Sequence, residues 1–113
     1  MRGRTNIGFG KSFPTSFTVK SASASSGSGT GYTGELVAEH GFMIMGANHD
    51  NNQFGVGYQV INGEYLQAIS TGSGDGETKV IVCECKTKCT VKAYVSNQND
   101  AHAGSYSVIL YTW

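Results

Sequence analysis

The segment that most constrains the fold runs from Phe54 to Gly63 and reads FGVGYQVING. Its first seven positions alternate between large apolar residues and small or polar ones, and a period of two is typical of a half-buried β-strand. The dipeptide Asn62-Gly63 suits a type I′ turn, which needs positive φ at both central residues. We therefore expect a β-hairpin here, with its return strand from Glu64 to Ser70.

Comparable short segments run through the rest of the chain, separated by turns rich in glycine, serine and asparagine. Further strands are expected at residues 17–22, 35–39, 42–45, 79–85, 90–95 and 105–113. Glycine accounts for 16 of 113 residues and charged residues for only 14%, while amphipathic helical patterns are missing. The pattern predicts an all-β protein, an antiparallel β-sandwich of jelly-roll or immunoglobulin-like type with about eight or nine short strands.

Two segments stand apart within this single domain, which covers residues 1–113. Residues 1–12 contain Arg2, Arg4 and Lys11 and no acid, so we expect a basic N-terminal arm. Residues 21–34 read SASASSGSGTGYTG, and this linker-like composition predicts a long surface loop.

All three cysteines lie in the stretch CECKTKC, from Cys83 to Cys89. The strands around it are separated by three residues, which predicts a hairpin with Cys85 opposite Cys89 and Cys83 on the same face. Reduced cysteines acting as small apolar side chains and a Cys85–Cys89 disulfide are both compatible with this arrangement. A metal site lacks a fourth ligand, and a nucleophilic thiol lacks a base, so we expect no metal and no cofactor.

Charge is balanced overall but unevenly distributed. Eight cations equal eight anions, which argues against nucleic acid as a partner. Residues 1–20 are basic, whereas all charges between residues 21 and 78 are acidic, so we expect Arg2 and Arg4 to contact the acidic surface of a second copy. No stretch approaches the roughly 18 apolar residues that a membrane span needs. No apolar segment of signal-peptide type follows the basic residues 1–6, so a secretory signal is not expected within this sequence. Cytoplasmic synthesis is therefore expected, with an extracellular location as the alternative.

The last strand, Ser105–Trp113, carries large side chains and no charge. Alternation places Tyr111 and Trp113 on the face of Ile109 and Tyr106 on the other. As an exposed edge, such a strand would invite aggregation, and a neighbouring subunit would cover it. We therefore expect a homo-oligomer, with three copies as the expected number and Tyr111 and Trp113 at the contact.

A second candidate site is the polar loop after residue 47. Aromatic rings beside convergent polar groups are typical of carbohydrate sites. This interpretation assigns ligand binding to Asn48, His49, Asp50, Asn51, Asn52 and Tyr58. No combination of nucleophile, base and stabilising group is recognisable, so an enzyme is not expected.

Two motifs resemble a known family. The strand entry FPTSFTV (Phe13–Val19), followed by GFMI (Gly41–Ile44), is similar to the start of small β-sandwich domains at phage tail-fibre tips and in H-type lectins. The family's closing Trp-Ile-Ala-x-Gly strand is missing, so no sugar-binding residue is carried over. The resemblance implies a non-enzymatic virion structural protein. Such a protein would be a phage capsid-decoration or tail/fibre subunit, assembled in the host cytoplasm with other virion proteins and able to bind a host-surface glycan. A carbohydrate-binding module or lectin is the alternative.

Overall fold

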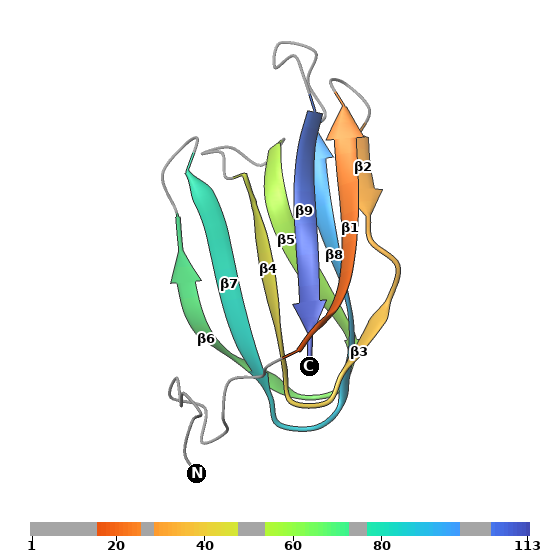
Figure 1. The fold of residues 1–113 in the computed structure, drawn as a ribbon, viewed down its shortest axis with the longest axis vertical. Coiled ribbons are helices and arrows are strands. Elements are labelled where there is room, and N and C mark those ends of the chain that lie inside the picture. The colour runs from red at the N-terminus through yellow and green to blue at the C-terminus, as the bar shows by residue number, and fades with distance from the viewer. Residues whose placement is uncertain (1–15, 26–28, 48–53, 73–76, 98–104) are drawn as a thin grey trace.

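The computed structural model describes residues 16–25, 29–47, 54–72, 77–97 and 105–113. Within these residues the chain forms nine β-strands and no helix, arranged in two facing layers (Figure 1). The strands are β1 (Thr18–Ser25), β2 (Gly29–Tyr32), β3 (Leu36–Ala38), β4 (Gly41–Ala47), β5 (Phe54–Asn62), β6 (Tyr65–Thr71), β7 (Thr78–Cys85), β8 (Cys89–Asn97) and β9 (Ser105–Thr112). The predicted all-β antiparallel sandwich is confirmed.

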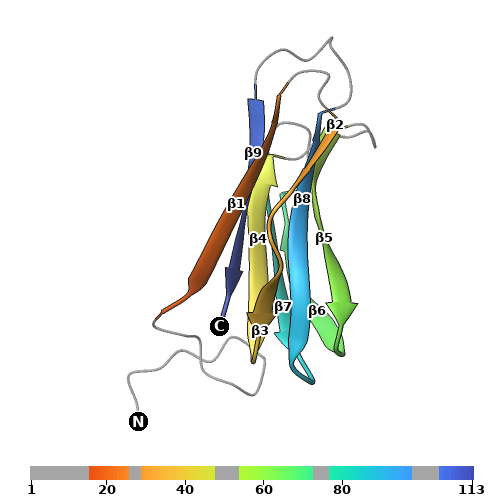
Figure 2. The same cartoon turned by 90° about the vertical axis from the view of Figure 1, so that its right-hand side faces the viewer.

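The two sheets differ in size. The larger has five strands in the order β1-β9-β4-β7-β6, and in the four-stranded sheet β8 pairs with β2 and β3 on one side and β5 on the other. Figure 2 shows β1, β9 and β4 on one side of the molecule and β2, β8 and β5 on the other. Among the described strands, only β2–β3 and β6–β7 follow each other within one sheet. Repeated crossing between sheets is typical of a jelly roll.

The sequence predicted two β-hairpins, at Asn62-Gly63 and after Cys85, and both predictions are wrong. β5 pairs with β8 while β6 pairs with β7, so the turn at Asn62-Gly63 carries the chain from one sheet to the other. Gly63 has a φ of 98°, but no described residue other than glycine has a positive φ, and the turn is therefore not type I′. The turn after Cys85 likewise leads from β7 in one sheet to β8 in the other, so Cys85 and Cys89 are not cross-strand partners. Local turn signals do not specify which sheet receives the next strand.

The predicted loop at residues 21–34 is largely strand, because β1 extends to Ser25 and β2 begins at Gly29. Small residues suit this place, since β1 and β2 approach closely where the sheet edges meet. A methyl group on Gly31 would collide with the carbonyl oxygen of Ser23. β1 pairs with β9 along its whole length. The expectation that β9 is an exposed edge is therefore also wrong.

The space between the sheets is filled by aliphatic, aromatic and cysteine side chains. Phe42, Ile44 and Leu110 of the five-stranded sheet are at most 1% exposed, and Val91 and Val95 of the facing sheet are fully buried. The buried residues form one cluster that joins both sheets. Burial of this kind supplies most of the free energy that favours folding.

Three crossing turns, β3–β4, β5–β6 and β7–β8, lie together at the lower end of the sandwich in Figure 1. The carbonyl oxygen of Glu64 accepts hydrogen bonds from the N–H groups of Lys86 (2.8 Å) and Thr87 (3.2 Å). The N–H of Glu64 in turn donates to Oγ1 of Thr87 at 2.8 Å. The carbonyl of His40 accepts from the N–H of Cys85 at 2.9 Å. These hydrogen bonds pair backbone groups that have no partner in the sheets, and they link the three turns to one another.

Candidate functional site

The outer face of the five-stranded sheet carries an unbroken row of apolar side chains. Strand register places one residue from every strand side by side, namely Val19, Tyr111, Met43, Val82 and Ile69. Val19 at the edge is 51% exposed, whereas Val82 is only 4% exposed because its neighbours cover it. Five apolar side chains in register make a continuous apolar stripe across the full width of the outer face, which is most exposed at Val19.

Two further rows widen this stripe. Ile109, Met45 and Val80 lie in register on one side of it. On its other side lie Trp113 and Leu66, and Leu66 is 52% exposed. These three rows, together with Phe17, are called the outer apolar face below. Among the described residues of these rows, Glu84 is the only one with a charge.

An aromatic cluster occupies one corner of the outer apolar face. The ring of Phe17 lies edge-on to Tyr111 at a centroid distance of 5.5 Å and to Trp113 at 5.6 Å. The backbone N–H of Trp113 donates a hydrogen bond to the backbone carbonyl of Gly41 at 3.1 Å. A methyl group on Gly41 would collide with the Trp113 indole ring. Glycine therefore lets the Trp113 ring lie across β4. The prediction that Tyr111 and Trp113 share a face is confirmed, and their role in a subunit contact stays a prediction.

The central strands of this sheet have continuous apolar runs rather than alternation. The runs are Phe42–Met45 in β4, Val80–Cys83 in β7 and Val108–Tyr111 in β9. Such runs are typical of strands that are buried on both faces. Here one face packs against the four-stranded sheet and the other is the outer apolar face. Sequence reasoning missed Met43 and Met45, although the runs were the signal that indicates them.

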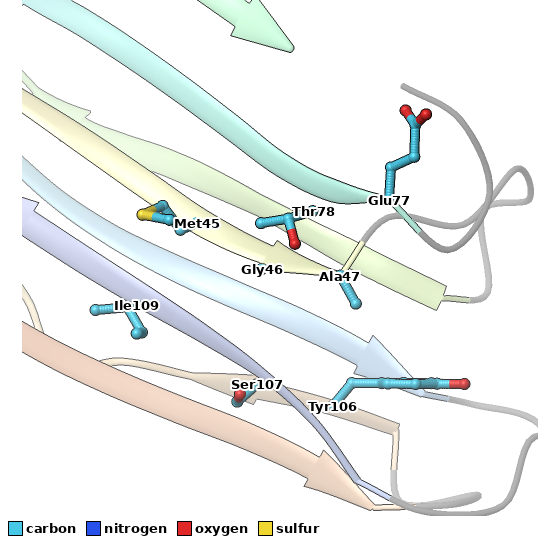
Figure 3. A pocket seen from close by; sticks show the side chains of 8 residues that line it. All are labelled: Met45, Gly46, Ala47, Glu77, Thr78, Tyr106, Ser107 and Ile109. Carbon is cyan, nitrogen blue, oxygen red and sulfur yellow. The ribbon is translucent and has the colours of Figure 1, made fainter. Parts of the chain in front are cut away.

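A shallow cavity of about 330 Å³ adjoins the outer apolar face. The cavity lies at the end of the β4–β9 pairing, whose last pair of residues is Gly46 and Val108. Figure 3 shows its lining, with Met45 and Ile109 at one end and Glu77 and Tyr106 at the other. The apolar end continues the outer apolar face, and the far end adds polar groups to its border.

The three cysteines are free thiols buried between the sheets. The Cys89 thiol lies 3.4 Å from the Glu64 carbonyl oxygen and 3.3 Å from that of Thr87, so it is a weak donor to the turns. Burial raises the pKa of Cys83 to about 11, although a hydrogen bond with Tyr58 acts in the opposite direction. Buried, neutral thiols of this kind are small structural side chains and poor nucleophiles.

Tyr58, which sequence reasoning assigned to a carbohydrate site, lies between the sheets. Its ring contacts Phe42 and Tyr65 at centroid distances of 5.4 Å and 5.8 Å. Its hydroxyl donates to Oε1 of Gln67 at 3.1 Å. Burial is the main cause that raises the pKa of this phenol well above its ordinary value, and hydrogen bonds with Tyr65 and Cys83 add to it. Tyr58 is thus a half-buried member of an aromatic cluster at the margin of the core, which joins β4, β5 and β6 and in which Tyr65 is 39% exposed.

Several predicted site residues lie outside the described residues. They are Arg2, Arg4, Asn48, His49, Asp50, Asn51 and Asn52. In the described part of the chain, no group of three or more histidine, cysteine or acidic side chains could hold a metal ion. Nor does that part contain a helix long and apolar enough to cross a membrane.

Comparisons with known proteins do not assign the chain to a family. No protein-family model matches it, and no curated protein or solved structure is significantly similar to it. The resemblance to tail-fibre tips and H-type lectins therefore stays a hypothesis.

Proposed function

We propose that this protein is a non-enzymatic structural subunit of a virus or phage particle that assembles with copies of itself through the outer apolar face. The observation that carries the proposal is the row from Val19 to Ile69, in which all five strands contribute an apolar residue in register. A capsid-decoration or tail/fibre subunit has to make such contacts repeatedly. The low charge content and the tail-fibre resemblance support the same class of protein.

The dimensions of the outer apolar face suit a protein contact. Each position in the rows occupies about 4.8 Å by 7 Å, so the ten apolar positions of the three rows give a patch of roughly 350 Å² in projection. Apolar patches of about 300–600 Å² on a monomer are often functional. Contact between two such patches would remove the large half-exposed side chains Val19 and Leu66 from water. A second copy is the simplest partner, because an apolar face with a single acid, Glu84, offers little charge for recognising a different protein.

Sedimentation equilibrium of two matched variants tests the assembly. Val19 and Val37 are 51% and 52% exposed and lie on the outer faces of opposite sheets. We expect Val19→Glu to weaken self-association at least about tenfold, because it places a charge in an apolar contact, and Val37→Glu to leave it unchanged. A wild-type chain that stays monomeric at high micromolar concentration would contradict the proposal.

The basic arm supplies an independent test of the expected charge contact. Arg2→Glu combined with Arg4→Glu is expected to weaken assembly at low ionic strength and much less at high ionic strength, since salt screens exposed charges. A genome neighbourhood that lacks capsid and tail genes would argue against the virion assignment while leaving the assembly itself intact.

A further inference from the structure

The outer face of the four-stranded sheet is mostly polar, in contrast to the outer apolar face of the five-stranded sheet. Three rows in register cross it, each centred on β8: Thr30–Ser96–Gly55, Tyr32–Tyr94–Gly57 and Val37–Thr90–Asn62. Lys92 and Gln59 lie opposite each other between the second and third rows. Apart from Val37, two tyrosines and Ile61, which lies in the β5 bulge and is 47% exposed, this face is polar. The two tyrosines are direct neighbours.

Gly57 of β5 leaves room for the ring of one of these tyrosines. Tyr94 stands opposite Gly57, and a methyl group on Gly57 would collide with the ring and hydroxyl of Tyr94. The end of the Tyr94 ring therefore lies down on the backbone of β5. Gly57 is buried beneath it, while Tyr94 itself remains partly exposed. The end of the ring thus covers Gly57, while part of the Tyr94 side chain stays accessible to a ligand.

Tyr32 and Lys92 extend this surface. Tyr32 is 50% exposed, and its ring centroid lies 5.9 Å from that of Tyr94. The ammonium group of Lys92 lies 4.6 Å from the centroid of Tyr32. Among the described residues in register on this face, Lys92 carries the only charge. The hydroxyls of Thr30 and Ser96, 3.2 Å apart, border the tyrosines on the far side.

We propose that Tyr94, Tyr32 and Lys92 form a binding platform for an acidic saccharide. The apolar C–H face of a pyranose ring matches the solvent-facing side of Tyr94, as sugars and amphipathic aromatic rings pair apolar face to apolar face. The carboxylate of the sugar is complementary to the ammonium of Lys92, the one charged group among the described residues in register on this face. Gln59 and Thr30, which are both exposed, supply donors and acceptors for the sugar hydroxyls.

The platform is independent of the proposed assembly. It lies on the opposite sheet from the outer apolar face, so an oligomer that buries the one face leaves the other accessible. Loss of saccharide binding would therefore not affect self-association, and a monomeric chain could still bind.

Titrations followed by NMR test the platform with matched sugar pairs. The probes are methyl β-D-glucuronide against methyl β-D-glucoside and methyl β-D-galacturonide against methyl β-D-galactoside, with N-acetylneuraminic acid as a further acid. For at least one acid we expect binding with shifts centred on β2, β5 and β8, about threefold to tenfold tighter than for its neutral counterpart where one exists. Absence of binding by every acid up to about 20 mM would overturn the proposal.

Substitutions of Tyr94 and Lys92, with a matched control, test what each side chain contributes to saccharide binding. Tyr94→Ala is expected to weaken binding by about threefold to tenfold, and Lys92→Gln to reduce the affinity for the acid to that for the neutral sugar. Lys88→Gln, which removes the same charge from a turn at the end of the sheet, should leave binding unchanged. Should Tyr94→Ala fail to fold, Gly57→Ala keeps the tyrosine but lifts its ring from β5, and it should also weaken binding. Binding that survives in Lys92→Gln with its preference for the acid intact would contradict the proposal.

Discussion

The two sheets of this sandwich face each other across one core but differ on their outer faces. Strands β4, β7 and β9 of the five-stranded sheet have continuous apolar runs, and both of their faces are apolar. Strands β5 and β8 of the four-stranded sheet alternate as far as the bulge at Ile61, with apolar residues toward the core and glycine, polar residues and Tyr94 outward. The core explains one apolar face of each sheet. The second apolar face of the five-stranded sheet is not covered by the other sheet, and this difference is the basis of the subunit contact proposed above.

The largest expected effect is on the free energy of unfolding, and it comes from substituting two consecutive residues of β9. Leu110 points into the core and is 0% exposed, whereas Ile109 belongs to the outer apolar face. Leu110→Ala should lower the free energy of unfolding by about 2–5 kcal/mol, because it leaves a cavity between the sheets.

Ile109→Ala is the matched control. In the dissociated monomer we expect it to cost clearly less than Leu110→Ala, and at high concentration we expect it to weaken self-association. Chemical denaturation at low protein concentration, together with sedimentation, separates the two effects. Equal losses of stability in the monomer would mean that the outer face is as well packed as the core.

The next effect concerns the turn that joins the two sheets at Gly63. Its φ of 98° is strained for a β-branched residue, and a side chain there would meet Cys89. Gly63→Val should therefore destabilise the protein by about 1–3 kcal/mol. Thermal denaturation measures this, and Asn62→Ala, at a position without positive φ, is the control. An unchanged melting temperature for Gly63→Val would mean that the turn is free to relax.

The sequence was sufficient to predict most of the strands, but neither β2 nor the pairing of the strands. Alternation and turn residues located β5, β7, β8 and β9 closely, because both signals depend on local backbone geometry. They predicted hairpins at Gly63 and at Lys86–Lys88, where the chain instead crosses between sheets. A turn signal reports that the chain reverses, and only tertiary packing decides whether the next strand pairs with the previous one or faces it.

The candidate sites show the same limit. Tyr111 and Trp113 were assigned to one face from alternation alone, and the structure agrees. The grouping of Tyr32 with Tyr94 joins strands that are far apart in sequence, so no local pattern indicates it. Residues 21–34 were misjudged because serine and glycine suit a linker and also suit closely approaching strands.

The smallest effect concerns a polar contact between the sheets, in which Cys83 on β7 meets Tyr58 on β5. Burial raises the pKa of Cys83 from 9.0 to about 11, so the folded protein keeps the thiol protonated where the unfolded chain has lost the proton. Between these values the unfolded state binds fewer protons, and stability must fall as the pH rises. From pH 8 to pH 10 this single group should lower the free energy of unfolding by about 1 kcal/mol. Cys83→Ala removes the group, and urea denaturation of both proteins over this range should show a shallower decline for the variant. Identical declines would mean that Cys83 ionises as readily in the fold as outside it, and that the two sheets do not exclude water at this contact.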